Sequence, residues 1–444
     1  MKKLNSSNMM IVLFFSLYMI LPSYFALEIN ESLPLMTASR IILLFCFIIV
    51  VLKGYGKLPI SMIKELGNDV KLYFLLFIII DIYHIFDTGV SSFNHLFILL
   101  FEQFGVIWII MILINNKFKF KKAIHILMYS SAIVAIISII GFVFNSNPFY
   151  ILNTVSRSMT QAGTTDIGYR NGLLRIEAGF GHPVYYGMYC SVMIFLSFYV
   201  YNYERKKVNS FLCLLLNIVS LVLTNSRGSI LGVIVTIFIS LIINGAKERK
   251  KYYKFFIIFI LFFSLSFILS LRVRGYIINI LQSFLVYFGI TQNTSVNFGA
   301  NMSFTSDRLM QFTGIIWTLM MSPIFGFGYG SQSKSVISYY NIGKWFPTTT
   351  FDVGYVEIFC CYGIVGTIAF LFLIRCIIKK LKFIKRESYS IMFRNIFIVY
   401  FICLLSVVNI DRVFWVILGL LLAYSRIVEL ESRTEYESIE TKMD

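Results

Sequence analysis

The sequence predicts an all-α, polytopic membrane protein of about twelve transmembrane helices. Of its 444 residues, 58% are hydrophobic and only 14% are charged, and the mean hydropathy is +0.79. Stretches of about 20 residues with few charges recur along the whole chain, as helices that span a bilayer require. A water-soluble protein of this composition would expose far too much apolar surface.

Twelve apolar stretches are expected to form the membrane-spanning helices. They cover residues 9–27, 35–52, 72–87, 93–114, 123–145, 182–201, 209–224, 228–244, 253–271, 352–374, 395–410 and 413–425. The first follows Met-Lys-Lys, as a signal peptide would, but its apolar run is long for one. Cleavage would also leave an odd number of spans, so we expect a retained helix.

The basic residues predict the orientation. With the N-terminus in the cytoplasm, most of the 39 lysines and arginines fall in inner segments, among them 53–71, 117–122, 247–254 and 375–394. Short loops rich in lysine and arginine stay in the cytoplasm. We therefore expect a multi-pass protein of the cytoplasmic membrane with both termini inside. The net charge of +17 reflects this topology and does not indicate a nucleic-acid partner.

The chain is expected to form a single integral membrane domain over residues 1–444, with two long outer loops at about 146–181 and 272–351. In the second loop, 274–290 and 307–331 are apolar or amphipathic, so we expect them on the outer leaflet or over the bundle. The seven cysteines lie in or beside apolar stretches, which predicts neither a disulfide framework nor a thiolate metal site.

The first outer loop concentrates polar chemistry in the sequence RNGLLRIEAGFGHP, residues 170–183. Arg170 and Arg175 are candidate phosphate ligands, because a guanidinium binds phosphate through two hydrogen bonds and stays charged when partly desolvated. The bland alternative is a solvated loop in which an arginine contacts lipid headgroups. Glu177 and His182 could handle a proton, although a histidine before a proline can also simply begin a helix.

Further polar residues stand beside other apolar stretches. Arg227 lies in the short outer turn 225–228, where it could point into the same cavity as Arg170 or reach lipid headgroups. In the second loop, Ser306 or Asp307 could cap a helix, which leaves Arg308 unexplained. The GFGYG stretch, 326–330, does not open a dinucleotide-binding unit, and a flexible turn is expected there.

Several ionisable residues lie at or inside the membrane. Asp352 stands at the entry of the tenth stretch, with Glu357 just inside, and Arg40, Asp81 and Glu102 lie in earlier stretches. Intramembrane charges are functional candidates by default. For Arg40, an internal pair with a carboxylate that serves structure is the favoured interpretation.

The order of these motifs resembles the O-antigen ligase/polymerase superfamily of bacterial membrane glycosyltransferases. An outer loop runs from Arg170 to Gly181 and ends in Gly-His-Pro, and a helix then ends in Thr-Asn-Ser-Arg-Gly, 224–228. Arg308 precedes a helix that carries Trp317, followed by a Pro-x-x-Gly-x-Gly run, 323–328, and Asp-x-Gly-Tyr…Tyr-Gly-Ile-x-Gly, 352–366. The resemblance covers roughly residues 170–370.

The resemblance implies a GT-C-like helical bundle that works without a cofactor, metal or nucleotide sugar. Ligases of the superfamily carry a His-Asn pair before the re-entering helix, and here that stretch reads Thr-Thr-Phe-Asp-Val-Gly-Tyr without histidine, which favours a polymerase. Its substrates would be polyprenyl-diphosphate-linked oligosaccharides, joined into capsular, exo- or O-antigen polysaccharide. A chain-length regulator and a flippase are further partners that it suggests.

The predicted site combines cations with candidate bases. The catalytic set is Arg170, Arg227, Arg308, Glu177, His182 and Asp352, and the substrate-binding set is Arg175, Asp307, Gly181 and Trp317. Fixed cations stabilise the charge that develops on a diphosphate leaving group, and a carboxylate or imidazole accepts the proton of the acceptor hydroxyl. Asp307 is a further candidate base, and the sequence does not indicate which of the candidates acts as the base.

Two other functions remain open at this point. One is a ligase-type transferase of the same superfamily. The other is a flippase or transporter for a lipid-linked oligosaccharide, which would suit the internal charges Arg40, Asp81 and Glu102. Transporters usually show paired structural repeats and interrupted helices, whereas this chain places much of its polar chemistry in two outer loops.

Overall fold

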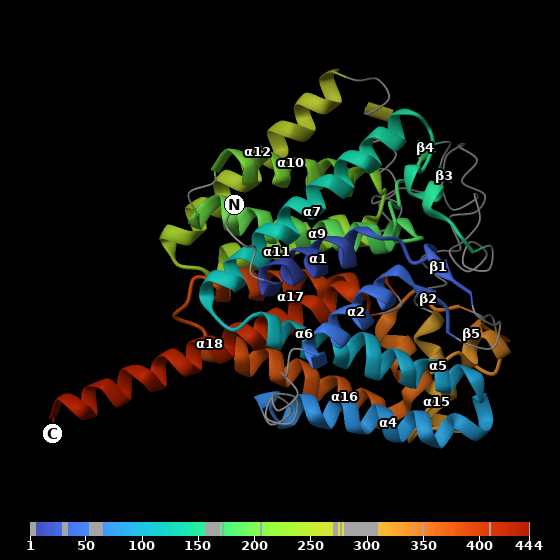
Figure 1. Cartoon of the computed structure of the whole chain (residues 1–444). Coiled ribbons are helices and arrows are strands. Elements are labelled where there is room, and N and C mark those ends of the chain that lie inside the picture. The colour runs from blue at the N-terminus through green and yellow to red at the C-terminus, as the bar shows by residue number, and fades with distance from the viewer. Residues whose placement is uncertain are drawn as a thin grey trace.

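The protein is mostly helical, and its long helices run roughly along one common direction (Figure 1). This computed structural model describes the chain apart from residues 1–5, 29–33, 53–64, 156–168, 171–172, 205–206, 270–273, 276–277, 279–309, 342, 349, 408–409 and 444. Most of the expected segment 274–290 therefore lies outside the described part. The residues Ser306, Asp307 and Arg308 lie wholly outside it.

Each predicted apolar stretch overlaps a helix, although the stretches 9–27, 35–52 and 395–410 extend beyond the helices found there. The long helices are α1 (Ser6–Ile20), α2 (Ala38–Leu52), α4 (Asn68–Thr88), α5 (Val90–Phe97) continued by the π-helix η2 (Ile98–Phe104) and α6 (Gly105–Leu113), α7 (Lys117–Val143), α9 (Pro183–Tyr203), α10 (Lys207–Leu223), α11 (Arg227–Ile243), α12 (Ala246–Leu269), α16 (Gly354–Phe383), α17 (Tyr389–Cys403) and α18 (Arg412–Met443). The shorter α15 (Thr313–Met321) belongs to the second loop.

Five of the described helical segments are long and apolar enough to cross a membrane, and five more are apolar but shorter. The long ones are Ser91–Leu113, Lys117–Val143, Pro183–Tyr203, Gly354–Phe383 and Arg412–Arg433. Large apolar side chains face outward on several helices, for example Leu75 and Ile79 on α4 and Phe45 and Ile48 on α2. The chain is therefore a multi-pass membrane protein, while the number of crossings stays a prediction.

One end of the bundle carries three short antiparallel hairpins, and we call it the hairpin end (Figure 1). They are formed by β1 (Ala26–Leu27) with β2 (Met36–Thr37), β3 (Tyr169–Arg170) with β4 (Leu173–Leu174), and β5 (Ser338–Asn341) with β6 (Lys344–Pro347). The described residues of the connections 21–37 and 144–182 and the segment that contains α15 belong to this end.

The opposite end is basic, and we call it the basic end. Here Lys117, Lys121, Lys379 and Arg426 form ion pairs with Glu431, Glu204, Asp69 and Glu65, at 2.6, 3.1, 2.7 and 2.7 Å. The last turns of α18 leave the bundle from this end (Figure 1). The gathering of lysine and arginine at one end agrees with the asymmetry that the sequence predicts.

Helix α9 lies near the centre of the bundle and is buried over most of its length, with Tyr186, Tyr189 and Phe195 among its fully enclosed side chains. It packs against α7, α10, α11 and α17. Its first turn reaches the hairpin end, so α9 carries His182 and the segment before it to that end from a rigid core.

Candidate functional site at the hairpin end

The segment 175–182 is firmly attached to its surroundings. The Arg175 Nε atom donates to the carbonyl of Thr224 at 3.0 Å, and the Ile176 amide donates to the carbonyl of Leu223 at 3.2 Å. The Tyr24 hydroxyl donates to the carbonyl of Ala178 at 3.3 Å. These bonds fix the segment between the α10–α11 turn and the chain that follows α1, so it is not simply a solvated loop.

Glu177 is buried within this segment. Its carboxylate accepts hydrogen bonds from the Tyr150 hydroxyl and from Asn147 Nδ2, the latter at 3.3 Å. Burial raises the pKa of Glu177 above its ordinary value, although these two donors and the charge of Arg175 oppose the rise. Burial also raises the pKa of Tyr150. The site thus holds a carboxyl group that takes up a proton more readily than one in water.

His182 is the N-cap of α9. Its Nδ1 atom accepts the Val184 amide at 3.1 Å, Pro183 occupies the first helical position, and Gly181 before it has a positive φ of 70°. The helix-starting role that the sequence allows is therefore present. Because the lone pair of Nδ1 is used by the cap, the neutral ring carries its proton on Nε2 and presents a donor there.

Arg227 begins α11 at a tightly packed turn. A Cβ added at Gly228 would lie 1.8 Å from Ser406 Oγ, and one added at Gly187 of α9 would lie 2.9 Å from Ser226 Cβ. Asn225 adopts a positive φ of 50° to make this turn. The small residues of the Ser-Arg-Gly motif thus let α9, α11 and the α17–α18 connection meet beneath the partly exposed Arg227.

Sequence reasoning missed Asp411, the residue before α18, and Arg412, the first residue of α18. Arg412 donates from Nη1 to the Leu21 carbonyl at 2.8 Å and to Ser39 Oγ at 3.0 Å, and its guanidinium lies 5.1 Å from the ring centre of Phe180. It therefore ties α18 to α1, α2 and the segment 175–182. The signal that could have found it is an Asp-Arg pair in a short connection between the last two apolar stretches.

The neighbouring Asp411 caps α18. Its Oδ1 atom accepts the Tyr400 hydroxyl at 3.0 Å and the amides of Val413 and Phe414 at 3.1 and 3.3 Å. Burial raises the pKa of Asp411 to about 6, against the opposing effect of these donors and of Arg412. A second carboxyl group with a raised pKa thus lies at the hairpin end.

The Pro-x-x-Gly-x-Gly run forms a turn, as expected at 326–330, and its backbone is hydrogen-bonded to α16. Helix α16 is interrupted at Gly363, where φ is 62° and ψ is −156°. The amides of Phe327 and Gly328 donate to the carbonyls of Cys360 and Cys361 at 3.1 and 2.8 Å.

In the same break, the amides of Ile364 and Val365 donate to the carbonyls of Pro323 and Ile324 at 2.9 and 3.1 Å. Non-helical backbone at membrane depth must have its polar groups satisfied within the protein. Pro-x-x-Gly-x-Gly and Tyr-Gly-Ile-x-Gly are therefore two halves of one structural motif.

Residues of the second loop lie over the start of α16. The Asp352 amide donates to Gln311 Oε1 at 2.9 Å, and the Gly354 amide donates to the Leu404 carbonyl at 2.9 Å. Trp317 on α15 donates from Nε1 to the Val336 carbonyl at 3.0 Å, and its ring centre lies 5.1 Å from that of Trp345. Helix α15 packs on α16, so the expected packing of this segment over the bundle is confirmed.

The internal charges of the earlier helices have partners. Arg40 Nε pairs with Glu102, which lies in the π-helical segment η2, and the expected internal pair is confirmed. Asp81 accepts His95 Nδ1 at 2.8 Å, and His95 Nε2 lies 3.1 Å from the Tyr362 hydroxyl. These charges pair with neighbouring helices, which accounts for them without a transported ion.

The family model described as O-Antigen ligase matches residues 212–371. These residues are thus similar to O-antigen ligases, and we call residues 212–371 the O-antigen ligase domain. The resemblance seen in the sequence is thereby confirmed: over these residues the chain is similar to membrane enzymes of the O-antigen ligase/polymerase type. No curated protein matches the chain.

The O-antigen ligase domain contains the turn with Arg227, helix α15 with Trp317, Asp352 and the part of α16 with the break at Gly363. Segment 175–182 and the pair Asp411–Arg412 lie outside it in sequence, yet Arg175 bonds to Thr224 of the domain and Gly354 of the domain bonds to Leu404. The structure thus joins the domain to both flanking parts of the chain at the hairpin end.

The structure brings some of the predicted site residues together. Arg175 binds the turn that carries Arg227, and Glu177 and His182 lie on the same segment as Arg175. The backbone of Arg170 lies in β3, where it pairs with Leu173. Asp307 and Arg308 fall outside the described residues.

Proposed function

We propose that the protein polymerises polyprenyl-diphosphate-linked oligosaccharide repeat units into a capsular, exo- or O-antigen polysaccharide. Its site would be the hairpin end, on the outer face of the cytoplasmic membrane, in a GT-C-like bundle of about twelve spans. The observation that carries the proposal is the attachment of the segment 175–182 to the turn 224–228 of the O-antigen ligase domain.

The chemistry needs a leaving group and a proton acceptor. The acceptor sugar's hydroxyl oxygen bonds to the anomeric carbon of the donor, while the bond from that carbon to the diphosphate oxygen breaks. The hydroxyl proton passes to a base, and the bonding electron pair leaves with the polyprenyl diphosphate. Cations placed at the departing diphosphate lower the barrier by about 3 kcal/mol each in well-ordered sites.

We assign the diphosphate to Arg170, Arg227 and Arg308. Arg175 supports them as a positioning residue, because its Nε atom holds the carbonyl of Thr224 three residues before Arg227. A guanidinium is suited to this role, since its charge persists in a partly desolvated site. Trp317 and Asp307 would contact the oligosaccharide from the second loop.

We assign the proton to Glu177 in preference to His182 and Asp352. Burial raises the basicity of the Glu177 carboxylate, and a base works best when its pKa lies near the working pH. His182 uses Nδ1 for the helix cap, which leaves its neutral ring as a hydrogen-bond donor. Gly181 lets the chain turn between Glu177 and His182.

Alanine variants of Arg170, Arg227 and Arg308 test the proposal. Each should shorten the polysaccharide ladder at equal protein abundance, whereas Lys344→Ala should leave it unchanged, because Lys344 is an exposed cation of β6 at the same end. If all three arginine variants still make full-length polymer, the proposed site is wrong. A single transfer of glycan to a different acceptor, without lengthening, would indicate the ligase-type reaction.

A further inference from the structure

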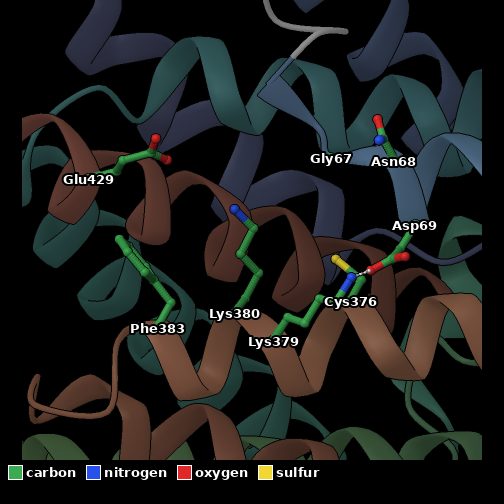
Figure 2. A pocket seen from close by; sticks show the side chains of 8 residues that line it. All are labelled: Gly67, Asn68, Asp69, Cys376, Lys379, Lys380, Phe383 and Glu429. Atoms are coloured by element: carbon green, nitrogen blue, oxygen red, sulfur yellow. Dashed lines mark hydrogen bonds and ion pairs between the residues drawn. The ribbon is translucent and has the colours of Figure 1, made fainter.

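A cavity of about 410 Å³ lies at the basic end of the bundle, between α4, α16 and α18 (Figure 2). It is lined by Gly67, Asn68, Asp69, Cys376, Lys379, Lys380, Phe383 and Glu429. Because α16 begins at the hairpin end and contributes its last turns here, the cavity is remote from the proposed catalytic site.

The two carboxylates in its wall already have basic partners. Asp69 lies 2.7 Å from Lys379 Nζ and 4.0 Å from Arg375 Nε, and Glu429 lies 2.7 Å from Arg433 Nη2. These pairs use the negative charge of the wall within the protein. The lining and its immediate partners therefore keep an excess of positive charge.

Lys380 carries that excess into the cavity. Its side chain is half-buried, and its ammonium group points into the space between Glu429 and the start of α4 (Figure 2). Among the described residues, no carboxylate oxygen lies within ion-pairing distance of it. An ammonium group in such a partly enclosed position favours an anionic ligand.

The start of α4 adds to the same preference. The N-cap residue Gly67 provides no side chain to bind the first amides of this 21-residue helix, and both Gly67 and Asn68 line the cavity. The first amides and the helix dipole contribute positive potential at this point, and the acidic side chain of the first turn, Asp69, is already paired with Lys379. The potential of the helix start and the charge of Lys380 thus act from two walls of one cavity.

The surroundings indicate what kind of anion fits. Phe383 lines the cavity and is 50% exposed, and Ile378 and Leu430 expose apolar surface on the adjoining helices. A free anion would gain nothing from this apolar border, whereas a lipid can place its phosphate on Lys380 and its acyl chains along α16. Basic pockets between membrane helices bind anionic headgroups in this way.

We propose that this cavity binds the phosphate headgroup of an anionic phospholipid from the leaflet at the basic end, with Lys380 as its principal cation. The inference is independent of the proposed polymerase reaction. It predicts that the full-length protein keeps phosphatidylglycerol through purification and prefers it to phosphatidylcholine.

Native mass spectrometry of the full-length protein, released from nanodiscs that contain both lipids, measures this preference. Lys380→Ala should reduce retained phosphatidylglycerol at least fivefold, and Lys380→Arg should keep it. Lys382→Ala is the matched control, because Lys382 is exposed on the same helix and does not line the cavity. It should behave as the wild type does.

Three outcomes would overturn the proposal. The first is equal retention by Lys380→Ala and Lys382→Ala, provided that both melt at the wild-type temperature. The second is equal retention of phosphatidylcholine and phosphatidylglycerol. The third is displacement of the lipid by millimolar inorganic phosphate, which would indicate a site for free phosphate. Should Lys380→Ala melt earlier, Lys380→Gln replaces it in the same comparison.

Discussion

Replacing Gly363 with alanine should strongly destabilise the protein. The added Cβ would meet the Ile324 carbonyl oxygen at 2.5 Å and the Gly326 nitrogen at 2.6 Å, and both are backbone atoms that cannot swing away. The φ of 62° is also unfavourable for any residue with a side chain. The change would therefore disturb the hydrogen bonds between the 323–328 run and the break in α16.

The expected loss follows from these two effects. Backbone strain at such a conformation costs roughly 1–3 kcal/mol, and each hydrogen bond lost contributes about 1 kcal/mol. With two or more of the four bonds disturbed, the free energy of unfolding should fall by about 3–6 kcal/mol. A decrease of that size should lower the melting temperature of the detergent-solubilised protein by several degrees.

The assay is thermal unfolding followed by size-exclusion chromatography of the remaining folded protein. Gly245→Ala is the matched control, because a Cβ at Gly245 meets nothing within 4 Å and its φ is not positive. Gly363→Ala should melt well below this control. Equal melting of the two variants would refute the reasoning that the run 323–328 is bound into α16 through this glycine.

Three further changes test other parts of the account. Glu102→Gln should lower the free energy of unfolding by about 1–3 kcal/mol by leaving Arg40 without its carboxylate, and an Arg40→Met/Glu102→Gln double variant should recover part of it in a melting experiment. In wild-type protein, the polymerisation rate should fall as the pH drops through the raised pKa of Glu177, because the base becomes protonated. The Glu177→Gln variant should polymerise slowly, and its rate should not show this fall at acidic pH. If the variant keeps the pH profile of the wild type, Glu177 is not the base. The folded state binds the Asp411 proton more tightly than the unfolded chain does, since its pKa rises from 3.8 to about 6. This contribution to stability is complete below about pH 4 and is lost as the pH rises through about 6, so the melting temperature of Asp411→Asn should vary less with pH across that range; identical curves would contradict the raised pKa.

The sequence predicts the helices because a membrane-spanning helix requires an apolar stretch, and because the distribution of lysine and arginine follows the topology. Both features can be read directly from the sequence. It also predicts a partner for Arg40, since an unpaired charge inside a membrane is costly. It could not identify Glu102 as that partner. Glu102 lies in a π-helical segment, which changes the face of the helix on which its side chains lie, and no sequence pattern indicates this segment.

The candidate site was predicted less completely. The motifs at 170–183 and 224–228 stand out by charge and glycine, and their contact through Arg175 and Thr224 needs the three-dimensional packing of α9, α10 and α11. Arg412 counts in the sequence only as one more outer basic residue, because its partners Leu21, Ser39 and Phe180 are far away along the chain. The GFGYG stretch suggests flexibility by composition, whereas its backbone is held by a break in α16 at Gly363.

Lipid-linked repeat units added to the purified protein in liposomes, without an ion gradient or nucleotide, test the proposed polymerase reaction itself. Separation of the products by length should show lipid-linked chains of several repeat units, with free polyprenyl diphosphate released at each step. Translocation of the repeat units across the liposome membrane without any lengthening would contradict the account and identify a flippase instead.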